Sequence, residues 1–174
     1  MKTVKNSIAQ IAPHYTMKRQ LDDYFSKFYS KLAKRSAILS ANDNAKAKEI
    51  AAWKEEVVAK WDSIEVLSVE KAEGLEMGDV ESGKEYTITI TVDEKGLNDA
   101  IGLELVTTYI SVDGHQHVYS TEPFSVVKKE GDLYTFQVKH SLSNAGSFKV
   151  AYRMFPKNAD LPHRQDFCYV RWFS

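Results

Sequence analysis

The sequence has 174 residues, of which 43% are hydrophobic and 27% are charged, and its formal net charge is −1 at neutral pH. This length suffices for one domain with a core plus an appendage, or for two small units, and the composition is typical of globular proteins. The near-zero net charge excludes the strongly basic surface that binding to nucleic acid or to an anionic membrane requires. We therefore expect no nucleic-acid partner and no membrane partner.

The first third of the chain predicts helices, because residues 1–63 contain no glycine and their apolar residues follow helical spacing. A first helix is expected over Thr3–Ile11, ending before Pro13. Thr16 is a candidate cap for the next helix, since its hydroxyl can accept a hydrogen bond from an unpaired backbone N–H. That helix carries an apolar stripe formed by Leu21, Phe25, Phe28, Leu32 and Leu39.

The stretch Asn42–Asn44 interrupts the helical pattern and can cap a third helix. In this third helix one face collects Ala47, Ile50, Ala51, Val57, Val58 and Trp61. The segment thus predicts a helical hairpin preceded by a shorter helix.

The hydrophobic period changes from helical to twofold after Ser63, which predicts a helical segment over residues 1–63 and a β domain over residues 64–174. No Pro/Gly/Ser-rich tract surrounds this boundary, so we expect the two parts to touch through Trp53 and Trp61.

The β domain is predicted to contain about seven strands with short turns. They are expected at Ile64–Val69, Tyr86–Val92, Leu103–Val112, Gln116–Lys128 with an interruption at Pro123, Leu133–His140, Ser147–Phe155 and Phe167–Phe173, and the polar stretch Glu73–Lys84 separates the first two. The resulting fold class is α+β, with an immunoglobulin-like antiparallel sandwich after the helices. Another β-sandwich or an open barrel is the alternative.

Three local features of the β domain can also be predicted. Asp113-Gly114 is typical of a tight hairpin turn, whose two central residues both take positive φ. A phase slip near Leu105-Val106 indicates a bulge. Pro123 cannot donate to a strand ladder, so the strand that contains it is expected at a sheet edge.

The sequence contains few motifs that indicate a catalytic, cofactor-binding or metal-binding site. All eight glycines are isolated, so no glycine-rich phosphate loop is present. His115 and His117 could supply two metal ligands, but no third is evident and exposed turn histidines are the favoured interpretation. The loop Asp160–Asp166 is rich in ionisable groups, and we expect Arg164 to pin it to a nearby carboxylate or carbonyl. No catalytic, cofactor-binding or metal-binding residue is predicted.

The single cysteine, Cys168, excludes an intrachain disulfide, and its apolar surroundings predict a buried, inert thiol. The chain begins without a run of signal-peptide character, and no stretch approaches about 18 consecutive apolar residues. These features favour a reducing, cytoplasmic location.

Motifs at both ends of the chain resemble one enzyme family. Near the start these are Asn6, Ile8, Ala9, Tyr15, Thr16, Arg19, Leu21, Tyr24, the run Lys31–Arg35 and the run Ile50–Lys54. Near the end they are Gly146, Phe148, Tyr152, Arg153, Pro156, Leu161, Pro162, Phe167, Val170, Arg171 and Trp172. Together they resemble the C-terminal region of the bacterial α-glucan phosphorylases, which act on glycogen, starch or maltodextrin.

The resemblance implies a parent glycosyltransferase that releases glucose 1-phosphate from α-1,4-glucans. In that family pyridoxal phosphate is held by a lysine that lies upstream of the matching region, so the cofactor is expected in the parent and none on this chain. The helices would complete the catalytic lobe, which makes the remainder of the catalytic domain the expected partner. This chain alone is therefore expected to be inactive, with a structural or assembly role for its β domain.

Two alternative functions remain open. Tyr109, Tyr119 and Trp172 lie in predicted strands, where packing in an aromatic core is the favoured interpretation. They are also candidate glucan contacts, since pyranose rings stack on aromatic faces. In that case the β domain would be a carbohydrate-binding module that tethers an enzyme to glycogen or starch. The other alternative is a protein-interaction module that forms a homodimer through the exposed helices.

Overall fold

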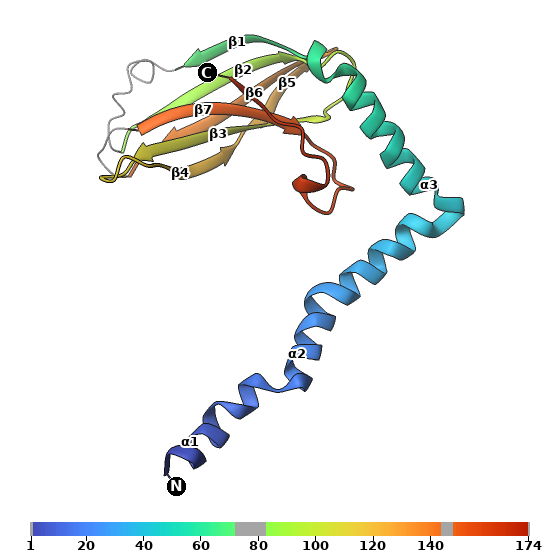
Figure 1. Cartoon of the computed structure of the whole chain (residues 1–174). Helices are drawn as coiled ribbons and strands as arrows, with labels where there is room; N and C mark the ends of the chain where they lie inside the picture. The colour runs from blue at the N-terminus through green and yellow to red at the C-terminus, as the bar shows by residue number, and fades with distance from the viewer. Residues whose placement is uncertain (1, 72–82, 144–147, 174) are drawn as a thin grey trace. The chain divides into compact units, whose positions relative to one another are not determined.

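The computed structural model describes residues 2–71, 83–143 and 148–173 (Figure 1). The chain divides into two compact units, residues 1–52 and residues 53–174. The boundary predicted between residues 63 and 64 concerns the end of a parent catalytic domain, and it stays a prediction. Among the described helices, none combines the length and the apolar character needed to cross a membrane.

The first unit is helical, as predicted. It contains α1 (Lys2–Gln10), the 3-10 turn η1 (Ala12–Tyr15), α2 (Met17–Tyr24), the π-helical turn η2 (Phe25–Tyr29) and most of α3 (Ser30–Lys60). The predicted cap is confirmed, because the Thr16 hydroxyl accepts a hydrogen bond from the Arg19 amide at 3.2 Å.

The predicted interruption of the helix is also confirmed. Ala41 is extended, and Asn42, Asp43 and Asn44 all have positive φ, between 51° and 60°. Asn and Asp enter this left-handed region more readily than most other residues. The pairing of the flanking helices as a hairpin stays a prediction.

The π-helical turn η2 was not predicted. The Ser30 amide donates to the carbonyl of Phe25, five residues back, instead of four. This extra residue brings the rings of Tyr24 and Tyr29 into a stacked contact at 6.2 Å.

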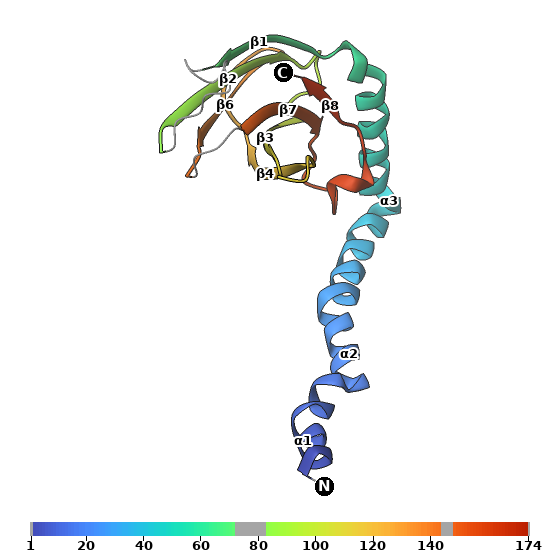
Figure 2. The same cartoon turned by 60° about the vertical axis from the view of Figure 1, so that its left-hand side comes forward.

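The second unit contains an antiparallel β-sandwich, which confirms the predicted α+β class. One sheet has the strand order β1-β2-β6-β5 and the other the order β4-β3-β7-β8 (Figure 2). The strands are β1 (Glu65–Lys71), β2 (Glu85–Asp93), β3 (Ile101–Ile110), β4 (Gln116–Pro123), β5 (Ser125–Glu130), β6 (Leu133–Ser141), β7 (Phe148–Pro156) and β8 (Arg171–Phe173).

The chain passes from one sheet to the other at Pro123, which explains why eight strands are described where about seven were predicted. Pro123 ends β4, and Ser125 begins β5 in the opposite sheet. The predicted edge position is confirmed twice, since β4 and β5 each lie at the edge of a sheet.

The core lies between the sheets and follows the twofold alternation of the sequence. Strand β2 buries Tyr86, Ile88, Ile90 and Val92, and β6 buries Tyr134, Phe136 and Val138 opposite them in register. The facing sheet contributes Ile101, Leu103, Leu105, Tyr152 and Met154. These side chains form one continuous apolar cluster.

Two local predictions are wrong in detail. The hairpin after β3 forms, but Asp113 does not have positive φ; instead Gly114 does, and its amide donates to the Ser111 carbonyl in a wider turn. The register of β3 against β4 shifts at Thr107/Thr108, two residues beyond the predicted bulge. Residues 73–82 of the stretch predicted to separate β1 from β2 fall outside the described residues.

The end of α3 belongs to the sandwich unit. Val57 is fully buried, Trp61 packs edge-on against Tyr169 with ring centroids 5.6 Å apart, and Trp53 meets Phe167 at 5.4 Å. The predicted contacts through Trp53 and Trp61 are therefore confirmed.

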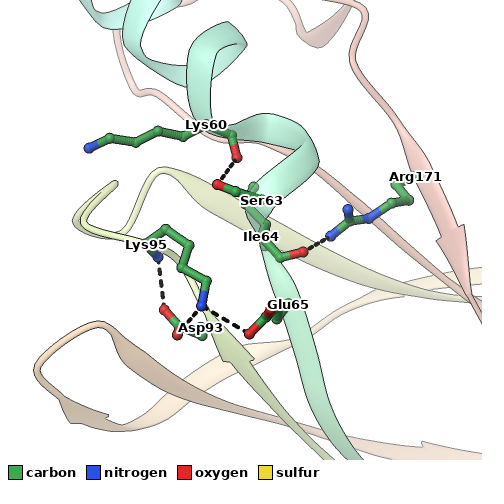
Figure 3. A network of polar contacts seen from close by, with 7 residues as sticks. All are labelled: Lys60, Ser63, Ile64, Glu65, Asp93, Lys95 and Arg171. Carbon is green, nitrogen blue, oxygen red and sulfur yellow. Dashed lines mark hydrogen bonds and ion pairs between the residues drawn. The ribbon is translucent and has the colours of Figure 1, made fainter.

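A polar network fixes the junction where the chain enters β1 (Figure 3). Arg171 of β8 donates to the carbonyl of Ile64 at 2.6 Å. On the neighbouring loop, Lys95 pairs with Glu65 at 2.9 Å and with Asp93 at 2.7 Å. These bonds connect β8, the start of β1 and the end of β2.

Glu94, directly after β2, is a buried carboxyl group with incomplete hydrogen bonding. Its Oε2 atom accepts a hydrogen bond from the Asp99 amide at 2.8 Å, whereas Oε1 has no partner in the described part of the chain. Burial, which disfavours the charged form, raises the pKa of Glu94 to about 7.

We expect this pKa to make the sandwich less stable as the pH rises. Between pH 4.5 and 7 the unfolded chain releases the Glu94 proton while the folded chain keeps it, so the free energy of unfolding falls across this window. Glu94→Gln should remove this decline and be more stable than the wild type at pH 8 by roughly 2 to 3 kcal/mol. Urea unfolding at several pH values measures the free energy of unfolding of both proteins. If this free energy depends on pH in the same way for the wild type and for Glu94→Gln, the raised pKa of Glu94 is contradicted.

Neighbouring valines of α3 provide a second test of the fold. Val57 is 0% exposed and Val58 is 46% exposed. Val57→Ala should lower the free energy of unfolding by about 2 kcal/mol because it removes buried methyl groups and leaves a cavity. Val58→Ala, the matched control, should change it by less than about 0.5 kcal/mol. Equal losses in chemical denaturation would show that α3 does not pack as described.

Candidate functional site

The structure separates two of the three aromatic residues that were candidate glucan contacts. Tyr109 of β3 lies on the same sheet face as the core residue Leu105, at the end of the strand, and is 38% exposed. Trp172 of β8 pairs with Arg153, which alternates with the core residue Tyr152, so Trp172 points to the outer face and is 53% exposed. The two side chains therefore cannot form one stacking platform.

Tyr119 lies on the same side of this sheet as Tyr109. Its ring packs edge-on against Phe148 at 4.9 Å, and Phe148 is the partner of Tyr109 in the β3–β7 register. The Tyr109 ring also stacks on His117 at 5.5 Å. No group of three or more metal-ligating side chains occurs among the described residues, so His117 is an aromatic neighbour of Tyr109 in this structure.

A row of interacting side chains crosses the outer face of the β4-β3-β7-β8 sheet. The Arg153 guanidinium lies 5.4 Å from the centre of the Trp172 ring. Its Nε and Nη2 atoms also donate to Oε2 of Glu104 at 2.7 and 2.6 Å. Glu104 is buried, although it stands on the outer face, so it needs charged partners to remain ionised.

A second guanidinium reaches the same carboxylate from the loop between β7 and β8. Arg164 donates to Oε1 of Glu104 at 2.7 Å, and its guanidinium lies 4.2 Å from the centre of the Phe155 ring. This confirms the prediction that Arg164 pins its loop to a carboxylate. A side chain at Gly102 would meet the Phe155 ring at 2.6 Å, so only glycine fits beneath it.

The two guanidinium groups determine the charge state of Glu104. Burial by itself would raise the pKa of this carboxyl group. The hydrogen bonds from Arg164 and Arg153, with the attraction of their charges, outweigh burial and hold the pKa of Glu104 below its usual value. The carboxylate is therefore ionised at neutral pH and fixes both arginines in place.

The loop that carries Arg164 is ordered by its own hydrogen bonds. His163 caps the short helix η4 (Arg164–Asp166) in a capping box, in which its ring accepts from the Gln165 amide and Asp166 accepts from the His163 amide. Lys54 of α3 donates to the Asp166 carbonyl at 3.1 Å. The loop is thus held at both the helix and the sheet.

Cys168 does not fit its prediction. The thiol is exposed and donates to the Gln165 carbonyl. The prediction of a buried thiol assumed that a strand begins at Phe167, but β8 begins only at Arg171, so the alternation of buried and exposed residues does not extend to Cys168.

Loop and sheet enclose a hollow of about 320 Å³, which we call the outer-face pocket. It is lined by Arg153, His163, Arg164, Gln165, Phe167, Cys168, Tyr169 and Val170. Each arginine uses only part of its donor set on Glu104, and within the described residues the remaining N–H groups have no protein acceptor. The pocket therefore combines hydrogen-bond donors held in place by Glu104 with aromatic walls, an arrangement suited to binding.

Sequence reasoning identified Trp172 and the pinning role of Arg164, but it missed Glu104 and Arg153 as site residues. A signal was present, since Glu104 is the only charged residue in the strand Ile101–Ile110. A carboxylate in such a strand needs a cationic partner, but its identity depends on which strand pairs with it.

The protein is an antiparallel β-sandwich that follows a helical segment in the chain and carries the Glu104, Arg153 and Arg164 network on one outer face. Residues 61–174 match the family model for the glycogen phosphorylase C-terminal domain, and the chain belongs to this family. A maltodextrin phosphorylase from Thermococcus litoralis is 28% identical over 193 aligned positions, which cover 97% of this chain and 20% of that enzyme. The chain thus spans about one fifth of the length of this relative.

The Glu104 network should contribute strongly to stability. Glu104→Gln leaves two guanidinium groups without their shared counter-charge and should cost about 3 kcal/mol in the free energy of unfolding. Glu85→Gln is the matched control, because Glu85 pairs with Lys139 on the surface and should lose less than about 1 kcal/mol. Guanidinium chloride unfolding compares the two, and a loss no larger than that of the control would contradict the described burial.

Proposed function

We propose that this chain is the non-catalytic C-terminal part of an α-glucan phosphorylase. The family match and the 97% coverage of this chain by a maltodextrin phosphorylase support the proposal. In it, residues 1–63 close the catalytic domain of the parent and the sandwich serves assembly. The partner is the remainder of the phosphorylase polypeptide.

The observation that carries this proposal is the apolar stripe of the helical unit. No described residue of α1, α2 or η2 is buried. The apolar side chains of Leu21, Phe25 and Phe28 are 58%, 64% and 52% exposed, and that of Leu32, at the start of α3, is 60% exposed. Monomeric proteins rarely leave contiguous apolar surface of this kind uncovered. We infer that the stripe packs against protein that precedes this chain in the parent.

The parent would be a glycosyltransferase that moves a glucosyl unit from an α-1,4-glucan to inorganic phosphate, in the cytoplasm. Pyridoxal phosphate would be bound by its upstream lysine and by no residue of this chain. We also propose that the sandwich is immunoglobulin-like, because its orders β1-β2-β6-β5 and β4-β3-β7-β8 reproduce the two-sheet arrangement of that fold with one additional edge strand.

The first test concerns catalysis. Incubated with maltoheptaose, inorganic phosphate and pyridoxal phosphate, the purified 174-residue chain should release no glucose 1-phosphate, because it lacks a glycine-rich phosphate loop. A coupled assay for glucose 1-phosphate measures this, with an intact phosphorylase as the positive control. Turnover by the chain alone would overturn the non-catalytic assignment.

The second test concerns the stripe. The double variant Phe25→Ser/Phe28→Ser should leave the unfolding of the isolated chain within about 0.5 kcal/mol of the wild type, since both rings are exposed. In the longer parent polypeptide the same variant should lose several kcal/mol, because both rings would be buried there. Lys31→Ser serves as the polar control in both proteins. If the double variant has the same small effect in the parent, the stripe is not an intramolecular interface.

A further inference from the structure

We infer that the outer-face pocket, together with Trp172, binds a short segment of an α-1,4-glucan. This inference rests on the proposed function and adds a second glucan site, outside the catalytic domain of the parent, formed only by residues of the sandwich unit. Its recognition elements are one exposed aromatic ring and a set of fixed hydrogen-bond donors.

The aromatic element is Trp172. Its indole is 53% exposed at the end of a sheet edge, where the Arg153 guanidinium lies 5.4 Å from the ring centre and leaves ring surface open to solvent. A pyranose presents C–H groups on its flat faces, and these pack on the negative face of an aromatic ring. Burying this ring against a sugar also removes exposed apolar area from water.

The polar element is the arginine pair. Glu104 holds Arg153 and Arg164 by bonds of 2.6 to 2.7 Å, so their unused N–H groups are pre-oriented before a ligand arrives. The side-chain amide of Gln165, which also lines the pocket, supplies a donor and an acceptor. Sugar hydroxyl groups both donate and accept hydrogen bonds, so they can pair with the arginine N–H groups and with the Gln165 amide.

The pocket carries more positive than negative charge. The ionised Glu104 lies between the two guanidinium groups and offsets one of their two charges, so a phosphate or carboxylate is the competing ligand that the test must include, whereas a neutral sugar would bind through its hydroxyl groups. The volume of about 320 Å³ is at the lower end of the range for ligand pockets and fits one or two glucose units.

Affinity electrophoresis of the full 174-residue chain in gels that contain glycogen, and calorimetry with maltoheptaose, test the inference. The wild type should be retarded and should bind maltoheptaose. Trp172→Ala should weaken binding at least tenfold, and Gln165→Ala should weaken it severalfold. Gln165 lies in an exposed loop, so its variant reports on binding even if Trp172→Ala proves poorly folded.

The matched control is Tyr109→Ala, since Tyr109 is an exposed aromatic residue on the opposite face of the same sheet. It should bind like the wild type. The inference is wrong if the wild type does not bind maltoheptaose, if Tyr109→Ala weakens binding as much as Trp172→Ala, or if inorganic phosphate displaces the glucan. None of these results affects the stripe experiment, so failure here is distinguishable from failure of the proposed function.

Discussion

Burial of apolar side chains between two facing sheets is the interaction on which the sandwich unit depends. Ile90 and Phe136 from one sheet and Leu105 and Tyr152 from the other belong to a single cluster, and Val57 of α3 joins it. The helical unit has no comparable cluster, since its apolar residues line one side of a helix without a facing layer. One unit is therefore stabilised by its own core, whereas the described residues of the other leave their apolar stripe exposed.

The sequence predicted most of the sandwich because burial alternates residue by residue in strands such as β2 and β6. In β2 every second residue is apolar and buried, and β6 follows the same alternation up to the buried polar residue His140. Prediction failed where local geometry depends on which strands pair. The width of the turn after Ile110, the register shift at Thr107 and the short length of β8 are set by strand register, which sequence spacing does not encode. The prediction that Cys168 is buried failed for the same reason, because β8 begins only at Arg171.

The candidate site was only partly visible in the sequence because its parts come from separate strands. Glu104 and Arg153 are 49 residues apart and become neighbours only through the β3–β7 register. Arg164 then joins them from a loop. A buried carboxylate shared by two guanidinium groups costs desolvation energy that an apolar core would not, so its presence on an outer face indicates a role in fixing side-chain positions. Trp172 owes its orientation to the same pairing of strands.

The π-helical turn η2 has a consequence for how insertions and deletions would act on the helical unit. A turn with a five-residue bond holds one more residue than an α-helix requires between Phe25 and Ser30. Removing one residue there would restore ordinary α-helical bonding and leave the preceding turns in nearly the same orientation relative to the following turns, whereas removing one residue from an α-helical turn would rotate them by about 100°. A single deletion at this π-helical turn would therefore disturb the relative positions of Leu21 and Leu32 little, so chain length is less constrained here than in the flanking α-helical turns.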